Sequence, residues 1–258
     1  MSSSYLNLAT ESAVAAGQIL LDFWSKRDSL DISTKRPGDF VSKADLSAEE
    51  SLKSNLLGSS NEFGWLGEET GSESNTRGRW IVDPLDGTTN FLKGIPHWAV
   101  SVALEIEGTL SLGVIHNPIT GETFSAEKGA GASLNGIPIG PSATSDFSTA
   151  LFGTGVPFGT MNHINEHSQD IARLMPHCAG VRRLGAASLD MAYVACGRLD
   201  GFWERSLQLW DIAAGLVILR EAGGKISGWS QDESSESSGN VICSSPQLFD
   251  KFFGLITN

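Results

Sequence analysis

The chain has 258 residues, 40% of them hydrophobic, which is enough to bury the core of a globular protein. Its 30 Asp and Glu residues outnumber 18 Lys and Arg residues, so the formal net charge is −12. A negative surface field of this kind repels nucleic acid and anionic membranes, and we expect neither as a direct partner. An anionic small molecule would meet the same repulsion, so binding one would require a local cation such as a metal ion.

The N-terminal segment predicts an amphipathic helix and no signal peptide. Its apolar residues from Leu6 to Trp24 recur at every third or fourth position, and no basic region precedes them. No other stretch approaches the roughly 18 uninterrupted apolar residues that a membrane span needs. We therefore expect a cytoplasmic protein, in which the widely spaced Cys178, Cys196 and Cys243 are buried small residues rather than zinc or redox ligands.

Strands dominate the prediction for the first half of the chain. A helix is expected over 45–57, followed by strands over 62–69 and 77–87 that each end in acidic residues. Further extended runs, separated by glycine-containing turns, cover 98–108, 109–118, 121–127 and 132–140. Such short runs joined by tight turns predict an antiparallel meander.

Helices return in the second half. They are predicted over 163–175, 186–196, 209–224 and 245–256, with a strand over 199–204 and a solvated polar loop over 230–240. Helices mixed with mostly antiparallel strands favour a mixed α+β fold, a layered sandwich of sheets and helices, over a doubly wound parallel sheet. We expect a single domain over 1–258, with an N-terminal half of about 1–140 and a C-terminal half of about 141–258.

Three acidic clusters lie beside apolar strand runs: Glu68 with Glu69, Asp83 with Asp86, and Asp211. Each cluster alone has an ordinary explanation as a helix-opening, turn or capping residue. Their shared position at the ends of buried runs indicates one pocket, in which buried carboxylates need compensation. Mg²⁺ prefers carboxylate oxygens, with water and substrate phosphate completing its octahedron, so we expect two ions that share Asp83.

The residues that follow Asp86 predict a phosphate-binding turn. Gly87, Thr88 and Thr89 place a backbone without a side chain and two hydroxyl groups where a helix begins, and free N–H groups there hold phosphate oxygens. Phosphoryl transfer mainly requires positioning and stabilisation of charge. Metal ions and backbone amides therefore suffice without a nucleophilic Ser or Cys.

Two long segments resemble the signature stretches of the inositol monophosphatase family: WIVDPLDGTTNFLKGIPHWAVSVAL at 80–104 and LWDIAAGLVILREAGG at 209–224. The resemblance continues through GEET at 67–70, the segment around Lys35, and GAASLDMAYVACGRLDGFWE at 185–204, so it spans nearly the whole chain. It implies a Mg²⁺-dependent phosphatase that hydrolyses inositol monophosphate. It also implies a five-layered αβαβα sandwich, a homodimer, and sensitivity to lithium at the second metal site.

The resemblance also assigns metal ligands, residue by residue. A first ion would be held by Glu68, Asp83 and the backbone carbonyl of Leu85, and a second by Asp83, Asp86 and Asp211, with two or three Mg²⁺ ions in each active site. Glu68 and the hydroxyl of Thr88 would orient the attacking water, and a water near Asp86 would protonate the leaving oxygen.

Substrate contacts follow from the same resemblance. The amides of Gly87 and Thr88 would hold the phosphate, while Ala187 and Glu204 would contact the sugar or polyol. The Glu204 carboxylate could accept hydrogen bonds from ring hydroxyls, a preference of little value for an aromatic or peptidic leaving group. Arg205 either tunes this pocket or pairs with a surface acid, and we favour pairing.

Two other functions stay open. The same chemistry could act on fructose 1,6-bisphosphate, histidinol phosphate or a 3′-phosphoadenosine nucleotide, although DGTTNF at 86–91 lacks the Lys and acid that the nucleotide-cleaving branch carries after DGT. Alternatively, the chain could be a regulatory or binding protein on the same scaffold. Unpaired carboxylates in one pocket would be costly without metal, which argues against a purely non-catalytic role.

Weaker signals have structural interpretations. His163 and His167, with Asp170 nearby, could share a helix face and bind a transition metal, but a solvated helix face is the simpler interpretation. His97 is expected to be a packed structural residue. The dispersed tryptophans, such as Trp65, are expected to fill the core rather than stack on bases.

Overall fold

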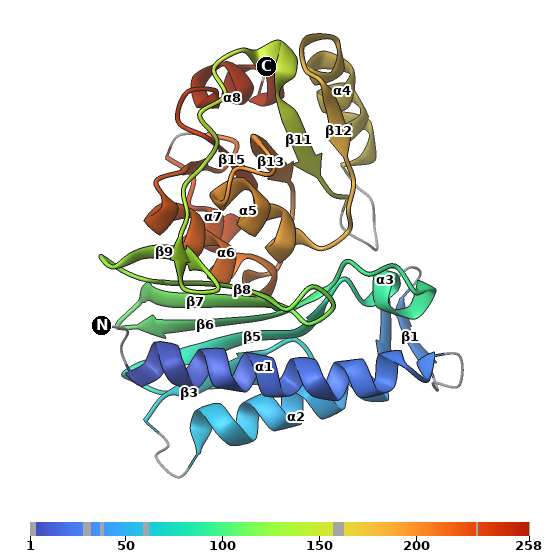
Figure 1. Ribbon diagram of the computed structural model, residues 1–258, viewed down its shortest axis with the longest axis vertical. Coiled ribbons are helices and arrows are strands. Elements are labelled where there is room, and N and C mark those ends of the chain that lie inside the picture. Colours follow the sequence, from blue (N-terminus) through green and yellow to red (C-terminus); the bar gives the residue numbers. More distant parts are fainter. Residues whose placement is uncertain are drawn as a thin grey trace.

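The computed structural model describes residues 4–27, 32–36, 39–58, 62–156, 163–230 and 232–257, and gives only the backbone for those between 32 and 42. Within these residues the helices and sheets form five successive layers (Figure 1). The predicted αβαβα sandwich is therefore confirmed. No helix in the described residues is long and apolar enough to cross a membrane.

The first layer consists of α1 (Ser4–Trp24) and α2 (Lys43–Leu57), which lie side by side on one face of the larger sheet (Figure 1). Helix α1 buries a row of small residues at helical spacing, which lets it approach the sheet closely. Helix α1 confirms the periodicity read from the sequence, and α2 confirms the helix predicted over 45–57. Between them along the chain is the hairpin of β1 (Ile32–Arg36) and β2 (Asp39–Ser42).

The larger sheet has the strand order β10-β9-β8-β7-β6-β5-β3-β4. Its strands are β3 (Gly64–Gly67), β4 (Gly71–Glu73), β5 (Gly78–Asp86), β6 (Ala99–Ile106), β7 (Thr109–Asn117), β8 (Glu122–Glu127), β9 (Gly131–Leu134) and β10 (Ile137–Pro138). Strands β6 to β9 pair antiparallel in sequence order, which confirms the meander. Strand β3 pairs parallel to β5. The two strands that lead into acidic residues therefore finish at the same end of the sheet.

The middle layer contains α5 (Ala187–Ala195) and α6 (Leu209–Ala222), which lie between the two sheets. Helix α6 is apolar nearly all round and almost wholly buried, as expected for a helix covered on both sides. Its approach to β7 depends on Gly113, where an added Cβ would come within 2.5 Å of the backbone oxygen of Ala214. The predicted helices over 186–196 and 209–224 are thus confirmed as the layer that joins the two sheets.

The smaller sheet has the order β12-β11-β13-β15-β14 and mixes parallel with antiparallel pairs. Its strands are β11 (Leu151–Thr154), β12 (Gly180–Arg182), β13 (Gly201–Glu204), β14 (Lys225–Ser227) and β15 (Val241–Ser244). Helices α4 (Ile164–Leu174) and α8 (Phe249–Thr257) form the outer layer on this sheet (Figure 1). The helices predicted over 163–175 and 245–256 are confirmed, although α8 begins four residues later.

Two predictions on the surface of this half are wrong. The stretch 230–240 is not simply a solvated loop, because it contains the helical turn α7 (Ser235–Ser238) and buries Ser235. The face of α4 that carries His167 and Asp170 is not solvated either, because both side chains are buried. His167 stacks on Trp203 of β13 with ring centroids 5.8 Å apart, so the helix packs this polar face against the smaller sheet.

Candidate active site

Asp83 and Asp86 lie at the end of β5 and are both buried, with 2% and 9% of their surfaces exposed. In a regular strand, residues three positions apart point to opposite faces of the sheet. The register with β6 shifts between these two residues, with Pro84 in the interval, so the local backbone departs from that alternation. The irregularity allows two acids from one strand end to share one neighbourhood.

Asp83 is the centre of this negative neighbourhood. Burial raises the pKa of Asp83 well above its ordinary value of 3.8, and repulsion from Glu68, Asp86 and Asp211 raises it further. The N–H of Leu85 donates to Asp83 Oδ1 at 2.9 Å and acts in the opposite direction. The acids that the sequence singled out in three separate clusters therefore interact electrostatically in the folded chain.

Glu68 follows β3 and is tied to the neighbouring strand. Its amide donates to the carbonyl of Val82, the residue before Asp83, at 3.2 Å. The turn that contains Glu68 is held by the buried carboxylate of Glu49 on α2, which accepts hydrogen bonds from the amides of Glu69 and Thr70, each at 2.8 Å. A helix of the first layer therefore positions this acid.

The C-terminal half contributes Asp211 and Glu204 to the same neighbourhood. Asp211 lies in the first turn of α6, where its Oδ2 accepts the amide of Gln208 at 2.7 Å in a capping box. Glu204 is the last residue of β13 and is 7% exposed. Burial raises the pKa of Glu204 well above 4.5, repulsion from Asp211 and Asp86 adds to the rise, and Arg183 lowers it.

The turn after β5 has the geometry of an anion-binding helix start. Gly87 adopts a φ of +92° and precedes α3 (Thr88–Lys93), and no side chain caps this helix. A Cβ at Gly87 would come within 3.0 Å of the carbonyl oxygen of His97, so only glycine fits without displacement. The first-turn amides of a helix lack partners within the helix, which makes them available to phosphate oxygens.

The hydroxyl of Thr88 connects this turn to α2. It lies 3.0 Å from the carbonyl oxygen of Leu85 and 3.3 Å from Oδ1 of Asp45, both within donating distance. Asp45 is 1% exposed and is a candidate site residue that sequence reasoning missed. Its position in the first turn of a predicted helix gave it an ordinary explanation, and a tertiary contact with Thr88 leaves no signal in the sequence.

The N-terminus of α5, in the middle layer, binds the side chain of Asp86 at the end of β5 in the larger sheet. Ser188 donates both its amide, at 2.8 Å, and its hydroxyl to Asp86 Oδ2. The pKa of Asp86 is raised from 3.8 to about 6 because burial outweighs these bonds and the amides of Ala187 and Leu189, which act in the opposite direction. Ala187, a predicted substrate contact, begins this helix and is 8% exposed.

A buried pair that sequence reasoning also missed lies next to these acids. Asp190 Oδ1 is 3.9 Å from His97 Nε2, and neither atom has a hydrogen-bond partner among the described residues. Burial, with repulsion from Glu204 and Asp86, raises the pKa of Asp190. The prediction that His97 is a packed residue is confirmed, since its ring also packs edge-on against Tyr193.

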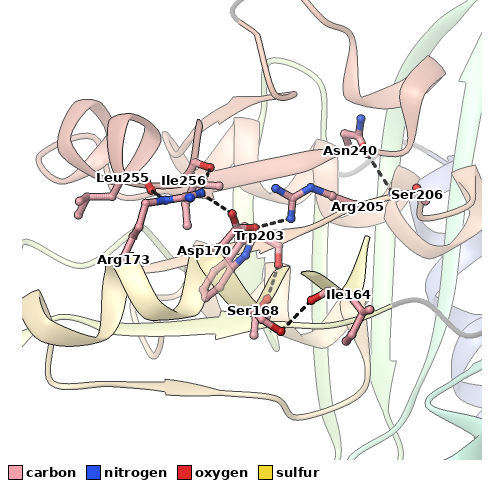
Figure 2. A network of polar contacts seen from close by, with 11 residues as sticks. Ile164, Ser168, Asp170, Arg173, Trp203, Arg205, Ser206, Asn240, Leu255 and Ile256 are labelled. Carbon is pink, nitrogen blue, oxygen red and sulfur yellow. Dashed lines mark hydrogen bonds and ion pairs between the residues drawn. The ribbon is translucent and has the colours of Figure 1, made fainter. Parts of the chain in front are cut away.

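Arg205, next to Glu204, belongs to a buried ion-pair network (Figure 2). It pairs with Asp170, which also accepts from Arg173 at 2.6 Å, and its guanidinium lies 3.9 Å from the centre of the Trp229 ring. The expected pairing of Arg205 is confirmed, but the expectation of a surface acid is wrong because Asp170 is fully buried. Arg173 also donates to backbone carbonyls of α8, so the network links the outer helices α4 and α8 to the residue that follows β13.

The chemistry of the acidic neighbourhood fits a divalent cation. It offers carboxylate oxygens whose charges raise one another's pKa values, beside a helix start that can bind phosphate. As they are positioned, however, no group of three His, Cys, Asp or Glu side chains in the described part of the chain could hold a metal ion. The ligand assignments therefore stay predictions, and the side chain of Lys35 lies outside the described residues.

Comparison with known proteins identifies the fold family. Residues 1–256 match the model of the inositol monophosphatase family. The chain is 44% identical over 253 residues to an inositol-1-monophosphatase of Rhizobium meliloti (strain 1021), with 95% of this chain and 93% of the relative covered. The chain belongs to the inositol monophosphatase family.

Other members of the inositol monophosphatase family have different names. Nus factor SuhB of Escherichia coli (strain K12) is 37% identical over 245 residues, covering 94% of this chain and 92% of the relative. The crystal structure of extragenic suppressor protein suhB from Bartonella henselae superimposes with a TM-score of 0.95 at 38% identity, with 99% of each chain covered. The family resemblance read from the sequence is therefore confirmed.

Proposed function

We propose that this chain is a magnesium-dependent phosphatase that hydrolyses inositol monophosphate to inositol and phosphate. The observation that carries the proposal is the electrostatic neighbourhood of Asp83, in which Glu68, Asp86 and Asp211 interact beside the glycine turn that opens α3. Its relatives include proteins named inositol-1-monophosphatase. An acidic site next to an anion-binding turn is the arrangement that a cation-dependent phosphatase requires.

In this proposal, Mg²⁺ would be held by the carboxylates of Glu68, Asp83, Asp86 and Asp211 and by the carbonyl of Leu85. When bound, two or three such ions would activate water and neutralise the charge of the phosphate. All five groups offer oxygen atoms, which are the ligands that this ion prefers.

The remaining steps belong to side chains and amides of the chain itself. The amides of Gly87 and Thr88 would hold the phosphate, as free amides at a helix start do. The Thr88 hydroxyl, within reach of Asp45, would orient the attacking water together with Glu68 and pass a proton toward the Asp45 carboxylate. Glu204 would accept hydrogen bonds from hydroxyls of the polyol, with Ala187 beside it.

A phosphate-release assay over a panel of esters tests the reaction and the substrate together. The panel contains inositol monophosphate, fructose 1,6-bisphosphate, histidinol phosphate and a 3′-phosphoadenosine nucleotide, each with and without Mg²⁺. We expect inositol monophosphate to give the highest kcat/KM and all turnover to require Mg²⁺. A higher kcat/KM for histidinol phosphate would refute the proposed substrate but keep the reaction class.

Two substitutions test whether the site is catalytic. Asp86→Asn and Asp211→Asn should abolish turnover and leave circular dichroism spectra unchanged, with exposed Asp22→Asn as the matched control. Near-normal activity in either site variant would overturn the two-metal assignment. If the wild type hydrolysed none of the esters, a binding or regulatory role on this scaffold would replace the enzymatic one.

The proposal extends to properties that the family resemblance implied. We propose that the chain is one domain over 1–258, assembles as a homodimer, works in the cytoplasm, and is inhibited by lithium. Sedimentation at micromolar concentration would test the dimer, and a lithium titration at several Mg²⁺ concentrations would test competition between the two cations. Lithium inhibition that does not weaken as the Mg²⁺ concentration rises would count against a cation site shared by lithium and Mg²⁺.

A further inference from the structure

Ser188 holds the carboxylate of Asp86 although the two residues are 102 positions apart in the chain. The serine is fully buried in the first turn of α5, and Asp86 ends a strand of the larger sheet. Both the amide and the hydroxyl of Ser188 donate to the same atom, Asp86 Oδ2. One residue of the middle layer therefore makes two bonds to one oxygen of a predicted metal ligand.

The other two predicted aspartate ligands are held differently. Asp83 Oδ1 accepts the amide of Leu85, two residues away, and Asp211 Oδ2 accepts the amide of Gln208, three residues away. Each of those bonds is local and comes with the turn or helix in which the aspartate lies. The position of Asp86 depends instead on a contact between layers, and on a hydroxyl as well as an amide.

Two donors on Oδ2 determine how the carboxylate can bind a cation. A carboxylate oxygen offers two lone-pair sites, so the amide and hydroxyl of Ser188 occupy those of Oδ2. If Asp86 binds a cation, Oδ1 would be the oxygen left for it, and the two bonds restrain rotation of the carboxylate about its last bond. Groups that orient a ligand in this way typically change metal affinity or activity by roughly 10- to 100-fold when they are removed.

We propose that Ser188 is a positioning residue that fixes the Asp86 carboxylate for divalent-cation binding. The proposal rests on the proposed metal-dependent function. The amide of residue 188 is present whatever the side chain is, so the hydroxyl is the specific contribution of serine at this position. Removing it leaves the carboxylate held by backbone amides alone, which restrain it less firmly and would weaken the cation site.

Calorimetric titration of the metal-free protein with Mg²⁺ alone, without substrate, tests this role directly. Ser188→Ala should weaken Mg²⁺ binding about tenfold or more, as expected for loss of an orienting contact. Ser244→Ala is the matched control, because Ser244 is also fully buried and donates its hydroxyl to a backbone carbonyl, that of Ser245, at 2.9 Å. Unchanged Mg²⁺ affinity in Ser188→Ala would overturn the inference.

A double-mutant cycle separates positioning from loss of stability. In an Asp86→Asn background, Ser188→Ala should have little further effect on Mg²⁺ affinity, because the carboxylate that it positions is gone. An equal loss in both backgrounds, with an equal fall in melting temperature, would show that Ser188 is merely structural and would reject the proposal. Ser188→Thr, which keeps a hydroxyl, should restore affinity toward that of the wild type.

Activity provides a second readout that a structural role would not give. Ser188→Ala should have low kcat/KM at limiting Mg²⁺ and recover most of it at saturating Mg²⁺, whereas Ser244→Ala should follow the wild-type Mg²⁺ dependence. If the wild type neither binds Mg²⁺ nor needs it for turnover, the proposed function fails. If the wild type binds Mg²⁺ and Ser188→Ala binds it equally well, only the role of Ser188 fails.

Discussion

Oε1 of Glu49 accepts hydrogen bonds from both the amide and the hydroxyl of Thr70. The Thr70 hydroxyl in turn accepts from Trp65 Nε1 at 2.9 Å. A Cβ at Gly67 would lie 2.2 Å from the same Glu49 oxygen, so the backbone of β3 approaches the carboxylate as closely as glycine allows. A carboxylate at the centre of a helix therefore sets the geometry of the turn that carries Glu68.

Glu49→Gln should disturb this turn although the side chain keeps its shape. One carboxylate oxygen becomes an NH₂ group that faces a backbone N–H, so at least one buried donor loses its acceptor. We expect the free energy of unfolding to fall by roughly 1–3 kcal/mol, the usual cost of a buried unsatisfied group. Urea denaturation measures this change. Glu50→Gln, at an exposed position of the same helix, is the control and should change it little.

Asp83→Asn should stabilise the metal-free protein at neutral pH. Because the folded-state pKa of Asp83 is raised, its stabilising contribution is present below 3.8 and is lost as pH rises. In EDTA at pH 7 the variant should therefore exceed the wild type in unfolding free energy by roughly 1–3 kcal/mol. The difference in unfolding free energy between the variant and the wild type should disappear near pH 4. A variant that is less stable than wild type at pH 7 would contradict the burial and repulsion that raise the pKa of Asp83.

His97 should reduce stability in acid. Burial lowers the pKa of His97 from 6.5 to about 4. The stabilising contribution of the neutral ring is therefore present above pH 6.5 and is lost as the pH falls toward 4. Relative to His97→Gln, the wild type should lose up to roughly 3 kcal/mol of unfolding free energy between pH 7 and pH 4. Asp190 is common to both proteins. His163→Gln, which removes a histidine at an exposed position, is the control variant.

Asp170→Ala should be strongly destabilising, because it leaves the guanidinium groups of Arg173 and Arg205 without the acid that joins them (Figure 2). Removing one partner of a buried pair typically costs about 3–5 kcal/mol. The exposed pair of Lys225 and Asp250 gives the matched control, and Asp250→Ala should cost less than about 1 kcal/mol. Similar losses of unfolding free energy in Asp170→Ala and Asp250→Ala would show that the burial of Asp170 adds little to the strength of its ion pairs.

The helices and the meander could be predicted because their signals are local. The spacing of apolar residues in α1 and the Gly-Gly end of α6 are visible within a few turns of sequence. The short strands β12 and β14, three residues each, have too little length for such a signal. They form because neighbouring strands of the smaller sheet provide partners.

The acids of the site could also be found in the sequence, but the groups that hold them could not. Glu68, Asp83 and Asp211 stand beside apolar runs, and an acid in that position is recognisable as a candidate buried charge from the sequence alone. Glu49 and Ser188 look like ordinary residues of helices, and their importance depends on contacts between layers. The same limitation led to the wrong prediction for α4, whose polar face is buried by the smaller sheet.

The separation of Asp83 and Asp211 along the chain bears on the rate at which the native state unfolds. Asp83 belongs to the larger sheet and Asp211 opens a helix of the middle layer, so their charges meet only after distant segments have come together. Because closing such a long loop costs conformational entropy, we expect these contacts to form late in folding. If Mg²⁺ binds these acids as proposed, it would therefore slow unfolding more than it speeds refolding, and its main effect would be to lengthen the lifetime of the folded chain.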